Sequence, residues 1–287
     1  SYAEEMIETF EKDVFPYIGG RPIAEIKPME LLAVLSRLND RGATEKLRKV
    51  RQRCGEVFRY AIITGRAEYN PAPDLVSAFA PHKKEHYAYL KADELPEFFR
   101  VFNTYTGSQI VKLAMRLLIL TGVRPGELRQ AEWQEIDFDN RLWEVPKERM
   151  KMRRPHCVPL PEQAIKILEQ LKNMTGQYQF IFPGRIHHSK PMSEMAINVL
   201  VRRIGYAGRV TGHGFRHTMS TILHEQGYNT AWIETQLAHV DKNSIRGTYN
   251  HAQYLDGRRE MLQWYADYMD SLEHGGNVVH GKFGKCG

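Results

Sequence analysis

The chain has 287 residues and contains 40 Lys and Arg against 34 Asp and Glu, which gives a formal net charge of +6. This length suits one large domain or two ordinary ones, and so moderate a positive charge permits nucleic-acid binding without establishing it. A membrane protein and a disulfide-bonded secreted protein are excluded, because the longest apolar run is interrupted by Arg116, the N-terminus is acidic, and the three cysteines are widely spaced.

Helical periodicity dominates residues 1–80. A first helix is predicted over residues 2–18, and a second between Pro28 and Gly42, because proline favours the start of a helix and glycine its end. A third is predicted over residues 44–65. Its apolar stripe is expected to face a core and comprises Leu47, Val50, Cys54, Val57, Phe58 and Ala61.

The side of the third helix opposite this stripe is basic. A single basic helix face is usually just solvated, and the functional alternative is a helix that lies against the DNA backbone or in the major groove. The candidate DNA-binding residues are Arg48, Lys49, Arg51, Gln52 and Arg59.

The periodicity stops at residues 69–90, where three prolines and the charged run HKKEH are typical of a linker between domains. A last amphipathic helix is followed by a glycine-rich tail that is expected to be flexible. The predicted organisation is a first domain at 1–82, a linker at 83–90, a second domain at 91–272 and a tail at 273–287.

The second domain is predicted to be mostly helical with one small antiparallel sheet. Two short strands, RLWEV at 141–145 and PHCVPL at 155–160, are joined by a basic connection. The fold class is therefore mostly α, with an N-terminal helical bundle and a larger α+β domain. Helices are expected at 92–102, 108–120, 125–133, 161–174, 193–205, 213–227, 229–239 and 255–272.

The stretch TGVRPGEL places Arg124 directly before Pro125, a favoured first residue of a helix. Exposed backbone N–H groups at a helix start attract anions, and an arginine there adds a planar fork for two phosphate oxygens. Glu127 is spaced to orient that guanidinium. An ordinary surface Arg–Glu pair at helical spacing is the alternative, and it is the more common one.

The connection between the two strands carries five basic residues. Such a turn is usually solvated, although a flexible lysine on it could reach into a cleft and donate a proton to a leaving oxygen. The cluster alone does not identify that residue. Its members are Lys147, Arg149, Lys151, Arg153 and Arg154.

The stretch HGFRHTMSTILHEQG contains three histidines near one helix face, which raises the question of a metal site. His224 lies two helical turns after His217, about 10 Å along the axis, which is too far for both to bind one ion. Histidines satisfied by local hydrogen bonds are the plainer alternative. His213 and Arg216, three positions apart, can share a face and act together on a phosphate.

Two further residues complete the candidate set. His239 lies in LAHV, and Tyr249 follows it in TYNH. A tyrosine in a loop is most often half-buried packing, but a phenol can act as a nucleophile when a base and cations lie close to it.

Taken in order, RPGEL, the basic hairpin, HGFRHT and LAH…TYNHA resemble the tyrosine recombinase family, in particular prophage and phage-type integrases, over nearly the whole chain. The resemblance implies that the first domain binds the core DNA site and that the second is catalytic. Members commonly carry a further arm-binding domain, which is missing here, and the lack of an initiator Met also predicts a fragment. The implied catalytic residues are Arg124, Lys151, His213, Arg216, His239 and the nucleophile Tyr249, supported by Glu127.

Two of these assignments have competitors. Lys147 and Arg149 lie close to Lys151, and Tyr254 is an alternative nucleophile at the start of the last helix. That helix carries enough apolar residues to dock on a neighbouring subunit, as often happens in the family, or to pack on its own domain.

The resemblance implies an enzyme that cuts and rejoins DNA through a 3′-phosphotyrosine, without cofactor or metal. The implied partners are double-stranded DNA at attachment sites, three further copies in a homotetramer, an excisionase and a DNA-bending host protein. The expected location is the bacterial cytoplasm. The alternatives are a topoisomerase with the same tyrosine chemistry and a catalytically silent DNA-binding module.

Overall fold

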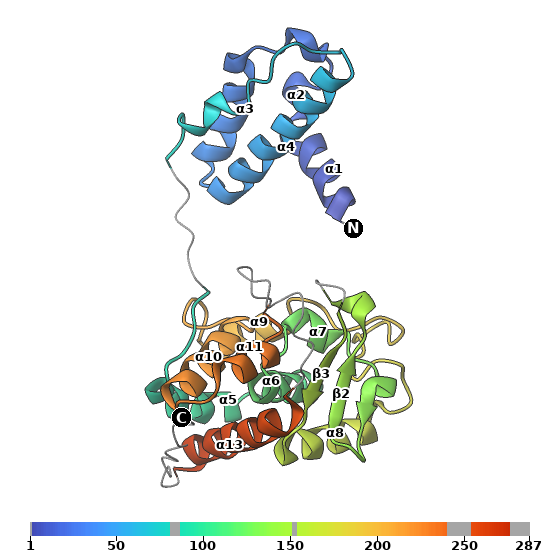
Figure 1. Cartoon of the computed structure of the whole chain (residues 1–287), viewed down its shortest axis with the longest axis vertical. Helices are drawn as coiled ribbons and strands as arrows, with labels where there is room; N and C mark the ends of the chain where they lie inside the picture. The colour runs from blue at the N-terminus through green and yellow to red at the C-terminus, as the bar shows by residue number, and fades with distance from the viewer. Residues whose placement is uncertain (1, 81–86, 151–153, 240–253, 276–287) are drawn as a thin grey trace. The chain divides into compact units, whose positions relative to one another are not determined.

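The computed structural model describes residues 2–80, 87–150, 154–239 and 254–275. The chain divides into two compact units, residues 1–85 and residues 86–287 (Figure 1). The first unit is helical, and the second combines helices with one small sheet, as the sequence predicts for the fold class.

The first unit contains four α-helices in its described part. The stretch predicted as one helix over residues 2–18 is divided at Val14, because Pro16 has no N–H to continue the hydrogen-bond ladder and its ring crowds the preceding turn. The second and third predicted helices are confirmed. The helices are α1 (Tyr2–Asp13), α2 (Phe15–Ile18), α3 (Pro28–Asp40) and α4 (Thr44–Ile63), with short 3-10 turns at Ile23–Glu25 and Asp74–Val76.

The core of this unit lies between α3 and α4, which pack against each other. One member of the predicted stripe on α4 was wrong: Val57 is 48% exposed. Residues 47, 50, 54, 58 and 61 already form a complete series at helical spacing, so Val57 lies at the edge of this series and stays partly in solvent. The buried residues of the core include Leu31, Val34, Leu35 and Leu38 from α3, and Leu47, Val50, Cys54 and Phe58 from α4.

The expected linker contains less free chain than its prolines suggest. Ala72 and Leu75 are buried in the first core, and the Asn70 amide donates to the carbonyl of Gly55 at 2.9 Å. At the other end Leu90 is 1% exposed and belongs to the second core. The predicted linker at 83–90 and domain start at 91 therefore place the beginning of the second unit too late.

The second unit is organised around one apolar helix, α6, which packs against α7, α8, α9, α10 and α13. It ends at Gly122, whose φ of +62° is readily adopted only by glycine. The predicted helices are confirmed within a few residues. The helices are α5 (Leu95–Asn103), α6 (Gln109–Thr121), α7 (Pro125–Arg129), α8 (Glu162–Thr175), α9 (Ala196–Arg203), α10 (Gly214–Glu225), α11 (Thr230–Gln236) and α13 (Leu255–His274), with 3-10 turns at Ala92–Glu94, Trp133–Glu135 and Lys147–Arg149.

The sheet is antiparallel, with the strand order β1-β2-β3, and β2 and β3 lie side by side in Figure 1. The two predicted strands are β2 (Leu142–Val145) and β3 (His156–Pro159), and Trp143 lies opposite Val158. The sequence analysis missed the third strand, β1 (Ile136–Asp137), because two residues are too few to show alternation.

The last helix, α13, packs on its own unit against α5, α6, α10, α11 and β3. Its apolar side, including Met261, Leu262 and Tyr265, is buried there. The flexible tail was predicted to begin at 273, which is wrong, because α13 continues to His274 and Glu273 forms an ion pair with Arg116. Among the described helices, none is both long and apolar enough to cross a membrane.

Candidate active site

Arg124 lies at the start of α7, directly before Pro125, as the sequence predicts. Glu127 holds it twice: the carboxylate accepts from the backbone N–H of Arg124 at 3.0 Å and from its Nη1 at 2.6 Å. Glu127 is 5% exposed, so this is a partly buried, charge-assisted pair with a fixed geometry. The other terminal nitrogen, Nη2, donates to the carbonyl of Ala238 at 2.9 Å.

Arg216 extends from the first turn of α10 and is 4% exposed. Its two terminal nitrogens donate to the carbonyls of Gly122 and Leu237. Its Nε has no hydrogen-bond acceptor among the described residues. Burial, and then the nearby charge of Arg124, lower the pKa of Arg216 to about 10, so the group is still charged at neutral pH.

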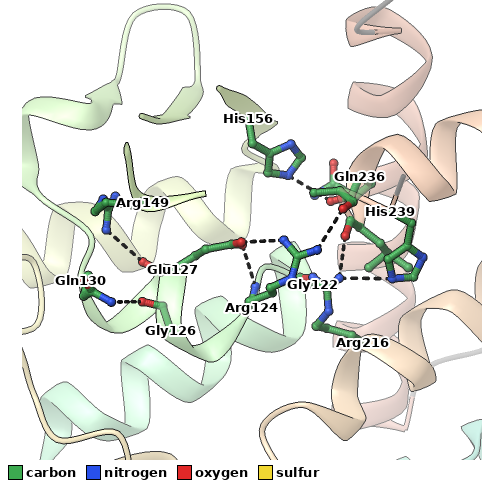
Figure 2. Close-up of polar contacts among 12 residues, drawn as sticks. Gly122, Arg124, Gly126, Glu127, Gln130, Arg149, His156, Arg216, Gln236 and His239 are labelled. Carbon is green, nitrogen blue, oxygen red and sulfur yellow. Dashed lines mark hydrogen bonds and ion pairs between the residues drawn. The ribbon is translucent and has the colours of Figure 1, made fainter. Parts of the chain in front are cut away.

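The two arginines meet at one turn. Residues 237–239 directly follow α11, and their carbonyls accept from Arg216 at Leu237 and from Arg124 at Ala238. Ala238 has a φ of +46°, a left-handed conformation that costs a residue with a Cβ roughly 1–2 kcal/mol. Figure 2 shows Arg124 joined to Glu127 on one side of this turn, and Arg216 joined to His239 on the other. Two like charges held this close favour an anion with at least two oxygens.

His239 lies at the end of the same turn. Its Nε2 is 3.4 Å from Nη2 of Arg216, and its Nδ1 is 2.9 Å from a carboxylate oxygen of Glu234. A guanidinium can only donate, so Nε2 is the acceptor and Nδ1–H donates to Glu234 in the neutral ring. A proton on Nε2 would make this nitrogen a donor for an incoming oxygen.

His213 directly precedes α10, three residues before Arg216. Burial, and then the charge of Arg216, lower its pKa to about 4, so the imidazole is neutral at pH 7 and can accept a proton. The ring of Tyr87 lies 4.5 Å from the imidazole, centroid to centroid. Tyr87 belongs to the stretch that was predicted to be linker.

The other two histidines of this stretch have local contacts. The ring of His217 lies 6.1 Å from that of His213, and Nδ1 of His224 is 2.7 Å from the carbonyl of Ser220. Within the part of the chain that the structure describes, no group of three or more His, Cys, Asp and Glu has the arrangement to hold a metal ion.

Two predicted catalytic residues, Lys151 and Tyr249, lie outside the described residues, as does Arg153. Their roles remain predictions. The competitor Arg149 is occupied: it forms an ion pair with the buried Glu135 and lies 3.4 Å from the carbonyl of Glu127. Arg149 therefore links its own 3-10 turn to α7 and to the 3-10 turn at Trp133–Glu135, while Lys147 is exposed.

The candidate DNA-binding residues all lie on α4. Lys49, Gln52 and Arg59 are exposed. Arg48 is exposed too, and forms two hydrogen bonds with Glu45 at 2.8 and 2.9 Å. Arg51 is half-buried and donates to the carbonyl of Ala72 at 3.3 Å. These positions leave the prediction of DNA binding by α4 open.

The sequence analysis missed a buried polar layer behind the arginines. It comprises Gln236 and His156, with Nε2 of His156 3.1 Å from the carbonyl of Gln236. Their burial at 0% and 5% exposure could not be read from single motifs. The only signal was the alternation of the strand PHCVPL, which puts His156 and Val158 on the same face.

The buried imidazole predicts acid sensitivity of the second unit. Burial, and then the charge of Arg258, lower the pKa of His156 from 6.5 to about 3. Below pH 6.5 the unfolded chain binds a proton that the folded chain does not, so stability is full above this pH and is lost as the pH falls. We expect the free energy of unfolding to drop by about 3 kcal/mol between pH 7 and pH 4 from this group.

Denaturant unfolding at pH 7, 5.5 and 4 measures this drop. His156→Gln keeps an N–H donor for Gln236 and should flatten the pH dependence, whereas the exposed control His224→Gln should not. An unchanged slope in His156→Gln would show that other groups cause the acid sensitivity.

Comparisons with known proteins agree with this arrangement. The sequence profile of the phage integrase family matches residues 88–255, and that of the phage integrase central domain matches residues 1–78. The integrase of Shigella phage Sf6 is 47% identical over 94% of this chain and 70% of its own length. The prophage integrase IntS of Escherichia coli (strain K12) is 46% identical over the same shares.

Solved structures show the same fold. A lambda integrase (75–356) dimer bound to a COC′ core site matches with a TM-score of 0.66 and 20% identity, over 88% of both chains. A lambda integrase tetramer bound to a Holliday junction matches with a TM-score of 0.65 and 21% identity, over 85% of this chain and 74% of that one. The two arginine motifs converge on one turn, and the family profiles and phage relatives cover nearly the whole chain. This chain therefore belongs to the phage integrase family and is a tyrosine recombinase that carries out site-specific recombination.

Proposed function

We propose that the paired arginines bind the phosphodiester that is cut during recombination, with Tyr249 as the nucleophile. The observation that carries this proposal is the convergence of Arg124 and Arg216 on the turn at residues 237–239, with Nε of Arg216 left without an acceptor among the described residues. Charge-assisted hydrogen bonds of this kind contribute roughly 1.5–3 kcal/mol each. They strengthen as negative charge spreads over the non-bridging oxygens in the transition state.

The proposed reaction exchanges one phosphodiester for another. The Tyr249 oxygen attacks phosphorus, the bond to the 5′ oxygen breaks, and a 3′-phosphotyrosine forms. His213, neutral at pH 7, takes the phenol proton, and Lys151 protonates the departing 5′ oxygen. His239 donates to a non-bridging oxygen. The phosphotyrosine ester retains the energy of the phosphodiester bond that was broken. A 5′ hydroxyl from a second duplex can therefore attack it and rejoin the strands without an external energy source.

The same proposal assigns the units and partners. The first unit binds the core of an attachment site through α4, and the second unit carries out the chemistry. Four active sites are needed to exchange all strands of two duplexes, so we propose a homotetramer on DNA. The fold shared with the lambda integrase tetramer on a Holliday junction supports this assembly. An excisionase and a DNA-bending host protein would direct the reaction, in the bacterial cytoplasm.

Trapping the covalent intermediate tests this function. A core duplex is first selected from random DNA by binding to this protein and is then nicked near the cleavage position, so that the released fragment diffuses away. We expect a protein–DNA adduct, with the linked tyrosine identified by mass spectrometry of the tryptic peptides. Adduct formation followed by strand transfer into a second duplex supports a recombinase. Adduct formation without transfer, together with relaxation of a supercoiled plasmid, supports a topoisomerase. Binding without adduct contradicts tyrosine chemistry.

A further inference from the structure

Arg258 is a buried cation in the first turn of α13, and it is 0% exposed. Its Nε and Nη2 donate to Oε1 of Gln236 at 3.1 and 2.7 Å, and Nη2 also donates to the carbonyl of Cys157 at 2.7 Å. This one side chain therefore joins α13 to α11 and to β3. Burying a guanidinium is costly unless its donors are matched, so its position is narrowly defined.

Gln236, the acceptor of Arg258, is itself bound from three sides. Its side-chain amide donates to the carbonyl of Thr121 at 2.7 Å, and its own carbonyl lies 3.1 Å from Nε2 of His156. With Arg258 on Oε1, both polar atoms of the side-chain amide are hydrogen-bonded. Gln236 thus fixes the end of α11 to the end of α6.

The residues that follow both helix ends supply carbonyls to the phosphate clamp, which we define as Arg124, Arg216 and His239. Gly122, next to Thr121, accepts from Arg216, and Leu237, next to Gln236, accepts from the same guanidinium. Ala238 follows in its left-handed conformation and accepts from Arg124. A turn in so uncommon a conformation persists only where its surroundings hold it. In this site the turn is held by backbone hydrogen bonds from residues 237–239 to α11, by the two arginines, and by Gln236 directly before it.

The approach of α13 to α11 is also tightly set. A Cβ at Gly257 would lie 2.4 Å from a ring carbon of Trp232, so only glycine allows the two helices to come this close. Gly257 directly precedes Arg258. The glycine at position 257 therefore lets α13 approach α11 closely enough for Arg258 to reach Gln236.

We propose that Arg258 is a positioning residue of the recombination site: it locks Gln236 and thereby holds the 237–239 turn and both arginines of the phosphate clamp in their reactive arrangement. The proposal rests on the proposed function, because it concerns the rate of DNA cleavage. It predicts that losing Arg258 slows cleavage by protein that is folded and bound to DNA.

The test compares Arg258→Met, Arg258→Lys and the matched control Arg259→Met with the unchanged chain. Each is mixed in excess with the nicked core duplex selected by this protein, and the rate constant and final yield of the covalent adduct are measured separately. DNA affinity and the thermal unfolding midpoint are measured on the same samples. Misplacing reacting groups by about 1 Å costs on the order of 100-fold in rate, which is the loss expected for Arg258→Met.

If Arg258 has a positioning role, Arg258→Met lowers the cleavage rate constant while DNA affinity stays within about 3-fold of normal. Arg258→Lys keeps the charge but loses the planar fork, so its rate constant should lie between those of Arg258→Met and the unchanged chain. A purely structural role lowers only the yield, and the surviving protein then cleaves at the normal rate; this outcome overturns the proposal. If Arg258→Met does not fold, Arg258→Lys decides, and a rate within about 2-fold of normal overturns it. If the unchanged chain and Arg259→Met form no adduct, the proposed function fails instead.

Discussion

Tyr249→Phe is expected to abolish the covalent protein–DNA adduct, because removing the phenol oxygen leaves no atom that can form a bond to phosphorus. The phosphate clamp and the DNA-binding surface are untouched by this change. Affinity for the selected core duplex should therefore remain within about 3-fold, while adduct falls below detection on nicked substrate. Denaturing electrophoresis with labelled DNA measures the adduct, and a native gel shift with the same DNA measures the affinity.

The control for this prediction is Tyr254→Phe. Tyr254 also follows His239 in the chain and lies directly before α13, with a φ of +48°. This variant should form adduct at close to the normal level. Adduct that persists in Tyr249→Phe and disappears in Tyr254→Phe would transfer the nucleophile to Tyr254.

Arg216→Lys is expected to slow cleavage by about 1,000-fold, within the range that removal of transition-state hydrogen-bond donors costs in other enzymes. Lysine keeps the charge but has no planar fork, so it cannot hold the carbonyls of Gly122 and Leu237 and a phosphate oxygen together. The loss should appear in the rate at saturating protein, because the interaction strengthens in the transition state.

Arg209→Lys is the matched control for Arg216→Lys. Arg209 lies in the same unit, is half-exposed and pairs with Glu94 on the surface, where exchanging one cation for another costs little. Arg216→Lys should also lower the unfolding midpoint, since two buried carbonyls lose their donors. The rate is therefore normalised to the folded, DNA-binding fraction. A normalised rate within about 10-fold of normal would show that Arg216 does not contribute the expected stabilisation of the transition state.

Holding two positively charged arginines close together destabilises the free protein, and a bound phosphate would offset this destabilisation. Burial and the neighbouring charge of Arg124 lower the pKa of Arg216 to about 10, so the charged form is disfavoured relative to a guanidinium in water. Glu127 compensates Arg124 directly, whereas Arg216 is bound by backbone carbonyls. Under the proposed function, a phosphate bound by both arginines would add its negative charge to the more limited stabilisation that Glu127 and Glu234 give to Arg216.

The sequence by itself determined the features that depend on neighbours in the chain. Spacing predicted α3, α4 and α6, and the motif RPGEL predicted both the start of α7 and the Arg124–Glu127 pair, because residues three apart on a helix meet. The order of motifs predicted the family, since six residues of suitable type in one order are far more specific than any one of them.

Only the tertiary structure decided what surrounds these residues. Gln236 contacts Thr121 and Arg258 contacts Cys157 across more than one hundred positions, and no local pattern encodes such pairs. Val57, Leu90 and Glu273 were misjudged for the same reason, because burial depends on which other element packs over a residue. The sequence thus specified which groups could bind a phosphate. The fold determined that Arg124 and Arg216 meet at one turn, because the carbonyls that hold them come from helix ends far apart in the chain.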